Sequence, residues 1–386
     1  MLASLPRTSA AGQLLTTERI ADGAAFELLR PEWDEILRAS DSNCVFLTWE
    51  WLYTWWKHLA EDRQLFILAV RRGSELVALA PFCFRPRSLS RGRLFPVLEF
   101  LGSGFVGSDY LDVIVRKGNS GEACRALISY LSARQLPLKC TNVKKGESMA
   151  ARLLEGLTEK SWAVAETQTN VCPFIPLADS TWESYLAGLS TEHRYNFNRK
   201  WRRLKRDYEV CFEQVRSGEH CREAIDLLIT QHNMRWQDRG GSDAFHTAGL
   251  VSFHREWTQL ALNRGWLRLY LLRLNTNPAA SLYGFLYGGV FYFYQSGFDS
   301  AYKHVSVGLV TMGLAIQDAI GESAEEYDLL HGDEAYKSHW CRHSRDLVRL
   351  ESFPPSAFGT VCRLSVELGR ASRAFARRMT ARGRAV

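Results

Sequence analysis

The 386-residue sequence has no long run of apolar residues, the feature that marks a membrane-spanning helix. A helix that crosses a bilayer needs roughly 18 or more consecutive apolar residues, and no segment approaches that length. Residues 1–20 also lack the basic start and the apolar core of a secretory signal peptide. We therefore expect a cytoplasmic protein.

Paired cysteines are missing as well. The sequence contains nine cysteines, an odd number, and no C-x-x-C pair. This usage is typical of buried thiols in a reducing compartment and does not indicate a disulfide framework. His339, Cys341 and His343 would point the same way on a strand, but they lack the distant second ligand pair of a typical zinc site. We therefore expect a terminal strand at this position and no metal.

Two further signatures are absent, and both absences narrow the function. No G-x-S-x-G elbow is present, which argues against a Ser-His-Asp hydrolase. No zinc-finger, RNP or helix-turn-helix signature accompanies the cationic segment 194–206, so we do not expect nucleic acid as a partner. A helix expected at 193–208 presents either a solvated basic face or a surface for an anionic ligand. Both interpretations remain open.

The excess positive charge is concentrated at the C-terminal end. The net charge is +6, from 48 basic and 42 acidic residues, and residues 357–386 hold seven arginines and one acid, so 41 of each sign remain elsewhere. Apolar residues recur at helical spacing through 358–382 with arginines between them. Such a basic amphipathic helix can lie on the inner face of an anionic membrane, dock on an acidic partner protein or pack on the body. The sequence leaves all three open.

The most regular pattern lies between Trp266 and Trp340. Three apolar segments with strand character follow one another, and Gly288-Gly289 supplies a hairpin turn between the second and the third. A helical pattern and one more short strand come next. The expected strands are 267–274, 280–287, 290–298 and 327–330, and the expected helix is 307–320.

The start of that helix is a candidate anion site. Free backbone N–H groups at a helix N-terminus attract phosphate or pyrophosphate. The loop 302–308 precedes the helix; Gly308 allows a ligand to approach closely, while Lys303 and His304 add charge.

The first half of the chain has a similar order of elements. We expect a helix rich in tryptophan capped by Thr48, a hairpin at 64–84, strands at 98–101 and 110–115, and helices at 121–133 and 148–159. The tryptophans of the first helix are either core anchors or a platform on which substrate stacks. Ser103-Gly104-Phe105 parallels Ser296-Gly297-Phe298, which suggests a duplicated domain.

Four segments carry a resemblance to a known family. They are Thr48 to Leu52 with Trp55-Trp56, the stretch from Pro176-Leu177 to Leu204, His232 with Arg235-Trp236, and, most specific, Tyr327-Asp328-Leu329-Leu330-His331-Gly332-Asp333-Glu334-Ala335-Tyr336-Lys337. Over about residues 15–350 the chain resembles the GNAT superfamily, in its FemAB-like, CelD-type acyltransferase branch. That branch is associated with cellulose and exopolysaccharide biosynthesis.

The resemblance implies a mixed α/β (α+β) fold with two tandem GNAT-like lobes, each a mostly antiparallel sheet flanked by helices. We place a disordered leader at 1–14, the lobes at 15–172 and 173–350, and the basic helical tail at 351–386. GNAT enzymes usually take the acyl group from acyl-CoA, such as acetyl-CoA, which the second lobe would bind. The expected contacts to this co-substrate are Phe298, Lys303, His304, Val305, Ser306, Val307, Gly308 and Leu309.

The implied reaction is acyl transfer from a thioester to an amine, or a hydroxyl, of a sugar-linked or other small acceptor. Glu334 or Asp333 is the expected base, since an amine with a pKa near ~10 must lose a proton. Lys337 is the expected oxyanion donor, because a lysine occupies a comparable place in FemAB-type peptidyl transferases. Tyr292 or Tyr294 is expected to protonate the leaving thiolate, and we favour Tyr294. The expected substrate-binding residues are Asp109, Tyr110, Arg194, His232, Arg235, Trp236 and Tyr336.

Two other functions stay open. The chain resembles FemAB-type enzymes that use aminoacyl-tRNA, but it lacks the helical arm that those enzymes carry for tRNA. A non-catalytic accessory protein of polysaccharide synthesis, held to a partner by the tail, would also fit the sequence.

Overall fold

The computed structural model describes residues 14–237 and 245–382, apart from the side chains of 235–237 and 373–382. The predicted leader at 1–14 therefore lies almost wholly outside the described residues. Within the described part of the chain, no helix is both long and apolar enough to cross a membrane. All nine cysteines are free thiols; six of them are buried, Cys124 and Cys341 are partly buried, and Cys211 is exposed.

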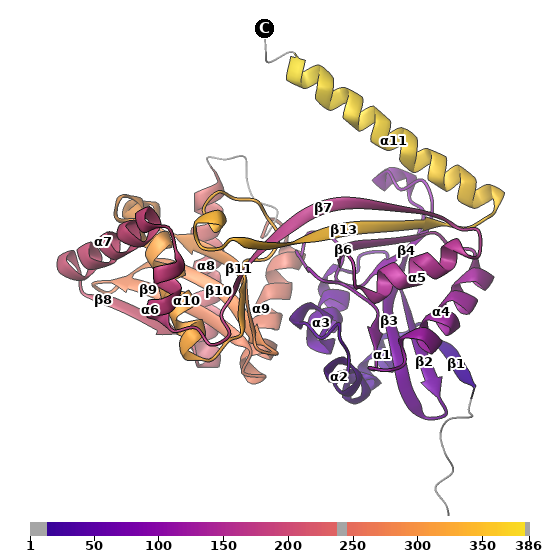
Figure 1. Ribbon diagram of the computed structural model, residues 1–386, viewed down its shortest axis with the longest axis horizontal. Helices are drawn as coiled ribbons and strands as arrows, with labels where there is room; N and C mark the ends of the chain where they lie inside the picture. The colour runs from indigo at the N-terminus through magenta and orange to yellow at the C-terminus, as the bar shows by residue number, and fades with distance from the viewer. Residues whose placement is uncertain (1–13, 238–244, 383–386) are drawn as a thin grey trace, which may run out of the picture.

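One mixed sheet runs through the whole molecule (Figure 1). Its strands follow the order β1-β2-β3-β4-β6-β13-β7-β12-β11-β10-β9-β8, with β5 paired to β3. The strands are β1 Leu15–Ile20, β2 Gln64–Arg72, β3 Glu75–Arg85, β4 Val97–Phe100, β5 Ile114–Val115, β6 Leu138–Lys144, β7 Ala163–Pro176, β8 Val210–Gln214, β9 Leu267–Leu274, β10 Asn277–Tyr287, β11 Val290–Phe298, β12 Glu326–Asp328 and β13 His343–Phe353.

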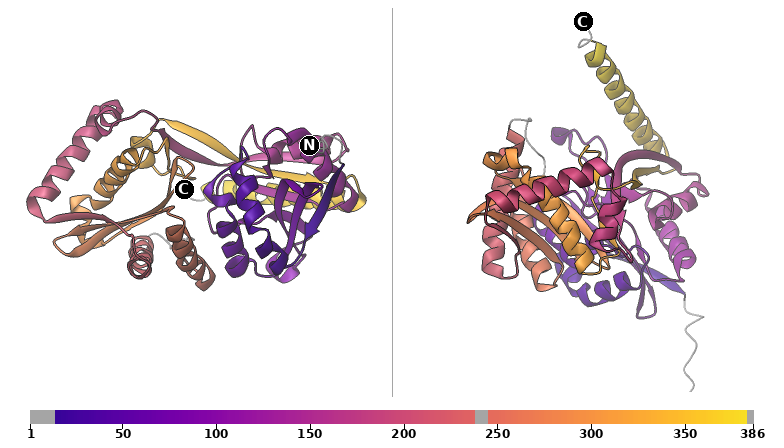
Figure 2. Two further views of the ribbon diagram at one scale, coloured as in Figure 1. Left: turned by 90° about the horizontal axis from the view of Figure 1, so that it is seen from below. Right: turned by 60° about the vertical axis from the view of Figure 1, so that its left-hand side comes forward.

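Helices cover this sheet in two groups, one for each lobe (Figures 1 and 2). The α-helices are α1 Gly23–Leu28, α2 Arg30–Arg38, α3 Trp49–Leu59, α4 Ser120–Arg134, α5 Met149–Thr158, α6 Trp182–Gly188, α7 Thr191–Asp207, α8 Gly218–Gln237, α9 Ala248–Asn263, α10 Val307–Gly321 and α11 Ala357–Arg382. Short 3₁₀ segments include η4 Ser300–Val305 and η5 Lys337–His339.

The two lobes repeat one topology. In the first lobe β3 and β4 are antiparallel, β4 and β6 are parallel, and α4 lies in the connection between them. In the second lobe β10 and β11 are antiparallel, β11 and β12 are parallel, and α10 connects them. The mixed fold with two tandem lobes is thus confirmed.

The lobes are joined by an exchange of strands. β7 leaves the first lobe and pairs with β12 of the second, while β13 returns from the second lobe and pairs with β6 of the first. The two long strands pair with each other from Ala163 to Phe174, and they run side by side between the lobes in Figures 1 and 2. The predicted boundaries after residues 172 and 350 fall inside these two strands.

The tryptophan-rich helix α3 is a core element. Its N-cap Thr48 accepts a hydrogen bond from the backbone N–H of Trp51, as predicted. Trp51 and Trp55 are fully buried, and the ring of Trp51 meets that of Trp257 on α9 edge to face at 4.9 Å. Buried Glu50 accepts from Arg264 at 2.7 Å across the lobes. The core interpretation of this helix is therefore confirmed, and α3 also packs one lobe against the other.

Two local predictions are wrong. The strand expected at 110–115 is paired only at Ile114–Val115, because Tyr110 takes a positive φ of 59° that breaks an extended chain. His339 and Cys341 do not lie on a strand: η5 ends at His339, and β13 begins at His343. Among the described residues, no three histidine, cysteine or acidic side chains are grouped to hold a metal.

Candidate active site

An aspartate–histidine pair lies where the two lobes meet. Asp109 comes from the loop between β4 and β5, and His331 follows β12. The two carboxylate oxygens lie 2.8 and 2.9 Å from Nδ1 of His331, and one of them also accepts its backbone N–H. The Asp109 carboxylate raises the pKa of His331 above its ordinary value. Asp109 is fully buried, whereas the His331 side chain is 38% exposed, so solvent or a substrate can reach the imidazole.

Tyr110 and Asp328 form a buried hydrogen-bonded pair next to the Asp109–His331 pair. The Tyr110 hydroxyl donates to Asp328 at 2.6 Å, and the Arg345 guanidinium lies 3.5 Å from the same carboxylate. Burial raises the pKa of Asp328 to about 7 in spite of these partners. The structure thus places Asp109 and Tyr110, predicted as acceptor contacts, against the strand and loop that carry Asp328 and His331.

Lys337 connects His331 with the loop that follows it in the chain. Its ammonium group is buried and donates to the carbonyls of Leu330 and His331 at 3.3 and 2.9 Å. It also forms an ion pair with Glu334 at 2.9 Å. Because Glu334 is 46% exposed, it is the partner that a substrate could displace from Lys337. Asp333, the other expected base, is exposed and makes no recorded polar contact with a described residue.

The two candidate tyrosines face different surroundings. Tyr292 is buried and packs edge to face on Phe46. The Tyr294 hydroxyl donates to the carbonyl of Val106, and burial raises its pKa. A Cβ on neighbouring Gly107 would lie 3.5 Å from His331 Cε1 and 3.7 Å from the Tyr294 hydroxyl. Tyr294 is therefore the tyrosine near His331.

A cavity of about 250 Å³ opens at the N-terminus of α10, beside β10, β11 and η5. Six of the eight predicted co-substrate contacts line it: Phe298, Lys303, Ser306, Val307, Gly308 and Leu309. His304 turns back to the carbonyl of Ala301, and Val305 is buried in the core, so neither of them lines the cavity. Tyr336, predicted to bind substrate, also lines it.

The backbone at this helix start favours an anion. Ser306 has a positive φ of 62° and its side chain caps no N–H group. Its carbonyl accepts from Leu309 and Val310, but the N–H groups of Val307 and Gly308 have no recorded acceptor among the described residues. Two unpaired N–H groups and the positive end of a helix dipole suit a phosphate. The residues present therefore fit a phosphate or pyrophosphate group of a ligand.

Two histidines in this cavity were not predicted as site residues. His193 on α7 is 7% exposed, and its Nε2 is buried without a hydrogen-bond partner. Its ring stacks on that of His339 at 5.3 Å, and both line the cavity. Burial, followed by the neighbouring His339, lowers the pKa of His193. No local pattern signalled this pair, because 146 residues separate its members.

The other predicted substrate contacts are scattered. Arg194 donates to the carbonyl of Ala187 at the start of α7. His232 is buried against Phe245, behind β11. Arg235 and Trp236 belong to α8, but their side chains lie outside the described residues. The structure therefore brings Asp109, Tyr110, Tyr294 and Lys337 to one site with His331, and Tyr336 to the adjoining cavity.

Residues 191–338 match the family model described as an acetyltransferase (GNAT) domain. The matched segment is therefore similar to a GNAT domain. It contains α10, the cavity at the N-terminus of this helix, His331 and Lys337. No curated protein matches the sequence.

Solved structures extend the likeness beyond the GNAT domain to both lobes. The crystal structure of FemX has a TM-score of 0.61 at 12% identity and covers 87% of this chain and 96% of its own. A conserved protein of unknown function from Bacteroides thetaiotaomicron has a TM-score of 0.53 at 13% identity, covering 87% of this chain and all of its own. L-PGS from Bacillus licheniformis has 0.51 at 10%, covering 88% and 96%. These likenesses concern the fold.

Proposed function

We propose that the chain is an acyltransferase that moves an acyl group from acyl-CoA, with acetyl-CoA the simplest donor, to an amine of a sugar-linked or other small acceptor. The observation that carries the proposal is that one loop joins two sites. Residues 329–340 supply His331 beside Asp109 and also Tyr336 and His339 in the cavity at α10. The resemblance to CelD-type enzymes supports an acceptor from exopolysaccharide, cellulose or cell-envelope synthesis.

The donor side would be held by α10 and η4. Val307 and Gly308 offer two unpaired N–H groups, and exposed Lys303 adds a positive charge. The donor supplies an activated thioester carbonyl when bound. Trp340 and Met312 make part of the lining apolar, which helps to exclude water from the thioester.

On the acceptor side, His331 is the base that this geometry favours. Asp109 occupies Nδ1, which leaves Nε2 to take the proton of the acceptor amine. The amine nitrogen forms a bond to the thioester carbon, the carbon–sulfur bond breaks, and the thiolate takes a proton. Lys337 is the proposed donor to the carbonyl oxygen, and Tyr294 the proposed acid for the thiolate. Glu334 and Asp333 remain alternative bases.

A thermal-shift titration with acetyl-CoA and longer acyl-CoAs tests the donor. A ligand at 100 times its dissociation constant stabilises the folded state by about 2.7 kcal/mol. A Cβ on Gly308 would meet only Phe298, at 3.7 Å, so Gly308→Ala should retain the shift while Gly308→Trp fills the cavity and abolishes it.

The outcome separates the competing functions. A saturable shift that Gly308→Trp removes supports transfer from acyl-CoA and ranks the chain lengths. No shift with any CoA would overturn this proposal, and the aminoacyl-tRNA-dependent and accessory functions would then be tested with charged tRNA and with polysaccharide-synthesis proteins.

A further inference from the structure

Helix α11 exposes large apolar side chains that a helix covering a core would bury. An amphipathic helix normally turns its apolar side inward. The side of α11 nearest the body is built from small residues, with Gly359 and Cys362 buried and Ser365, Val366 and Gly369 lining a groove. Four large apolar side chains in the described part of the helix are exposed instead: Phe358 by 44%, Val361 by 62%, Leu364 by 47% and Leu368 by 68%.

The helix also extends beyond the first lobe. Figures 1 and 2 show α11 projecting from this lobe, and Arg370, midway along the helix, forms an ion pair with Glu351 on β13. The groove between it and the ends of β4, β6, β7 and β13 has a volume of about 900 Å³. Burial within the chain therefore does not account for the apolar row of α11, which we define as Phe358, Val361, Leu364 and Leu368.

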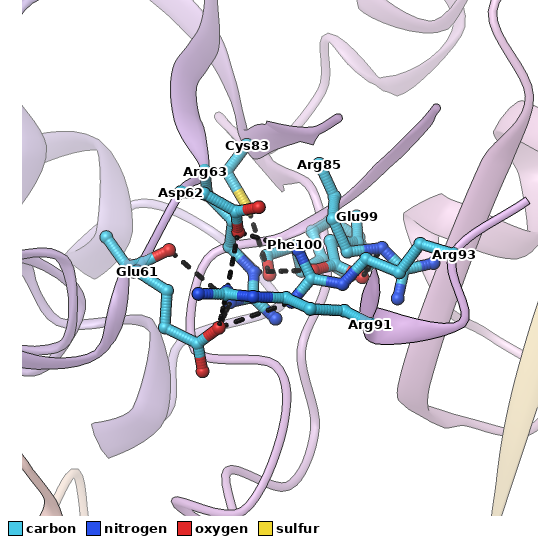
Figure 3. A network of polar contacts seen from close by, with 10 residues as sticks. Glu61, Asp62, Arg63, Cys83, Arg85, Arg91, Arg93, Glu99 and Phe100 are labelled. Atoms are coloured by element: carbon cyan, nitrogen blue, oxygen red, sulfur yellow. Dashed lines mark hydrogen bonds and ion pairs between the residues drawn. The ribbon is translucent and has the colours of Figure 1, made fainter. Parts of the chain in front are cut away.

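The groove beneath the helix is basic. One acid, Glu351, lines it together with the cations Arg85, Arg91, Arg93, Lys139, Arg349 and Arg370. Figure 3 shows how three of the arginines are fixed: Arg91 and Arg93 are paired with Glu61 and Asp62, and Arg85 lies 3.5 Å from Glu99. Glu99 also accepts from Arg63 at 2.7 Å. With Arg63 included, seven cations face four carboxylates, and the excess charge is positive.

We propose that α11 docks the protein on an anionic phospholipid surface. The apolar row enters the boundary between headgroups and acyl chains. The arginines of residues 357–386, with the excess positive charge of the groove behind the helix, attract the anionic lipid. The charge of this segment favours an anionic membrane over a second copy of the chain, because residues 357–386 carry seven arginines and one acid. A second copy of the chain would bring the same arginines, and like charges repel. This inference does not depend on the acyltransferase activity.

Vesicle co-sedimentation of the full chain tests the proposal. We expect binding to phosphatidylcholine vesicles that contain phosphatidylglycerol, weaker binding at high salt, and little binding to phosphatidylcholine alone. The double variant Leu364→Asp/Leu368→Asp should lower the partition coefficient at least tenfold. The matched control is Leu14→Asp/Leu28→Asp, which adds the same charge at leucines that are 91% and 80% exposed, and it should bind like the wild type.

Both variants replace exposed side chains, so their thermal midpoints should match that of the wild type. Equal vesicle binding by the α11 variant and its control would overturn the proposal, as would no binding to either vesicle. Light scattering distinguishes one further outcome. If the wild type is a dimer without lipid and the α11 variant is a monomer, the apolar row binds a second copy and the membrane proposal is wrong.

Discussion

At the scale of single residues, the site depends on a contact across 222 positions of sequence, between Asp109 and His331. The sequence analysis placed His331 in the motif at 327–337 and gave Asp109 as a substrate contact, but no local pattern pairs them. The strand expected at 110–115 gave no sign of the positive φ of Tyr110. This backbone angle turns the chain next to Asp109. Tertiary contacts of this kind cannot be predicted from periodicity, because periodicity reports only which face of an element is buried.

The Asp109–His331 pair predicts a shift in pH dependence. A general base must be neutral, so kcat/KM should rise with pH through the pKa of His331, which Asp109 raises. Asp109→Asn removes the carboxylate charge, so the inflection should move to lower pH while the plateau falls by up to about 10²-fold. An unmoved inflection would exclude His331 as the base. Asp333→Asn, in the same loop, is the control, and a shift there would identify Asp333 instead.

The Asp109–His331 pair also makes the free energy of unfolding depend on pH, in a direction that follows from the raised pKa of His331. The pKa of His331 is higher in the folded than in the unfolded state, so the pair stabilises the fold fully below about pH 6.5 and loses this contribution as the pH rises through the folded-state pKa. The wild type should exceed Asp109→Asn in free energy of unfolding by more at about pH 5.5 than at about pH 9. Urea unfolding at both pH values measures the difference.

At the scale of elements, local sequence patterns predicted where helices and strands begin wherever one face of the element is buried or glycines fix the turn. β9, β11 and α10 begin where their patterns begin, with Gly288-Gly289 between β10 and β11. β6 and β8 were not predicted, and their residues alternate weakly between buried and exposed. Pairing with distant strands makes them strands, and that pairing is not visible in a short window.

The packing of α7 on α10 gives a prediction at this scale. A Cβ on Gly313 would lie 2.2 Å from the Phe197 ring, which is held between Trp182 and Trp340. Gly313→Ala gains helix propensity of about 1 kcal/mol but overpacks a core contact, so we expect a net loss of about 1–2 kcal/mol in urea unfolding. Gly321→Ala, in the same helix with nothing within 4 Å, should be neutral or stabilising.

A double variant checks the cause. Phe197→Leu shortens the blocking ring, so Gly313→Ala/Phe197→Leu should be less destabilised than the sum of the two single variants. Simple additivity would mean that the clash is relieved by some other movement.

At the scale of the whole molecule, the duplicated topology followed from the repeated order of elements, but the exchange of β7 and β13 did not. Local patterns define strands, and the partner of each strand is chosen by the complete chain. The predicted boundaries after residues 172 and 350 are drawn between the lobes, while the strands themselves pass from one lobe to the other.

The exchange predicts that the lobes share one folding transition. A chain that ends at Arg342 lacks β13 and leaves one edge of β6 and most of β7 unpaired, so it should not unfold cooperatively in urea. A chain that ends at Ser356 keeps β13 and loses α11, and we expect it to retain the circular dichroism spectrum and a cooperative transition. A cooperative transition in the shorter chain would show that each lobe folds alone.

Strand β13 also constrains the order in which the protein can be assembled during its synthesis. About 200 residues separate the end of β6 at Lys144 from the end of β13 at Phe353. Ribosomes add roughly 5–20 residues per second, so the edge of β6 waits about 10–40 s for its neighbour. The N-terminal half cannot be finished first: newly made chains hold an open sheet edge until the last strand emerges, and during that interval they depend on dilution or on a chaperone to avoid pairing with one another.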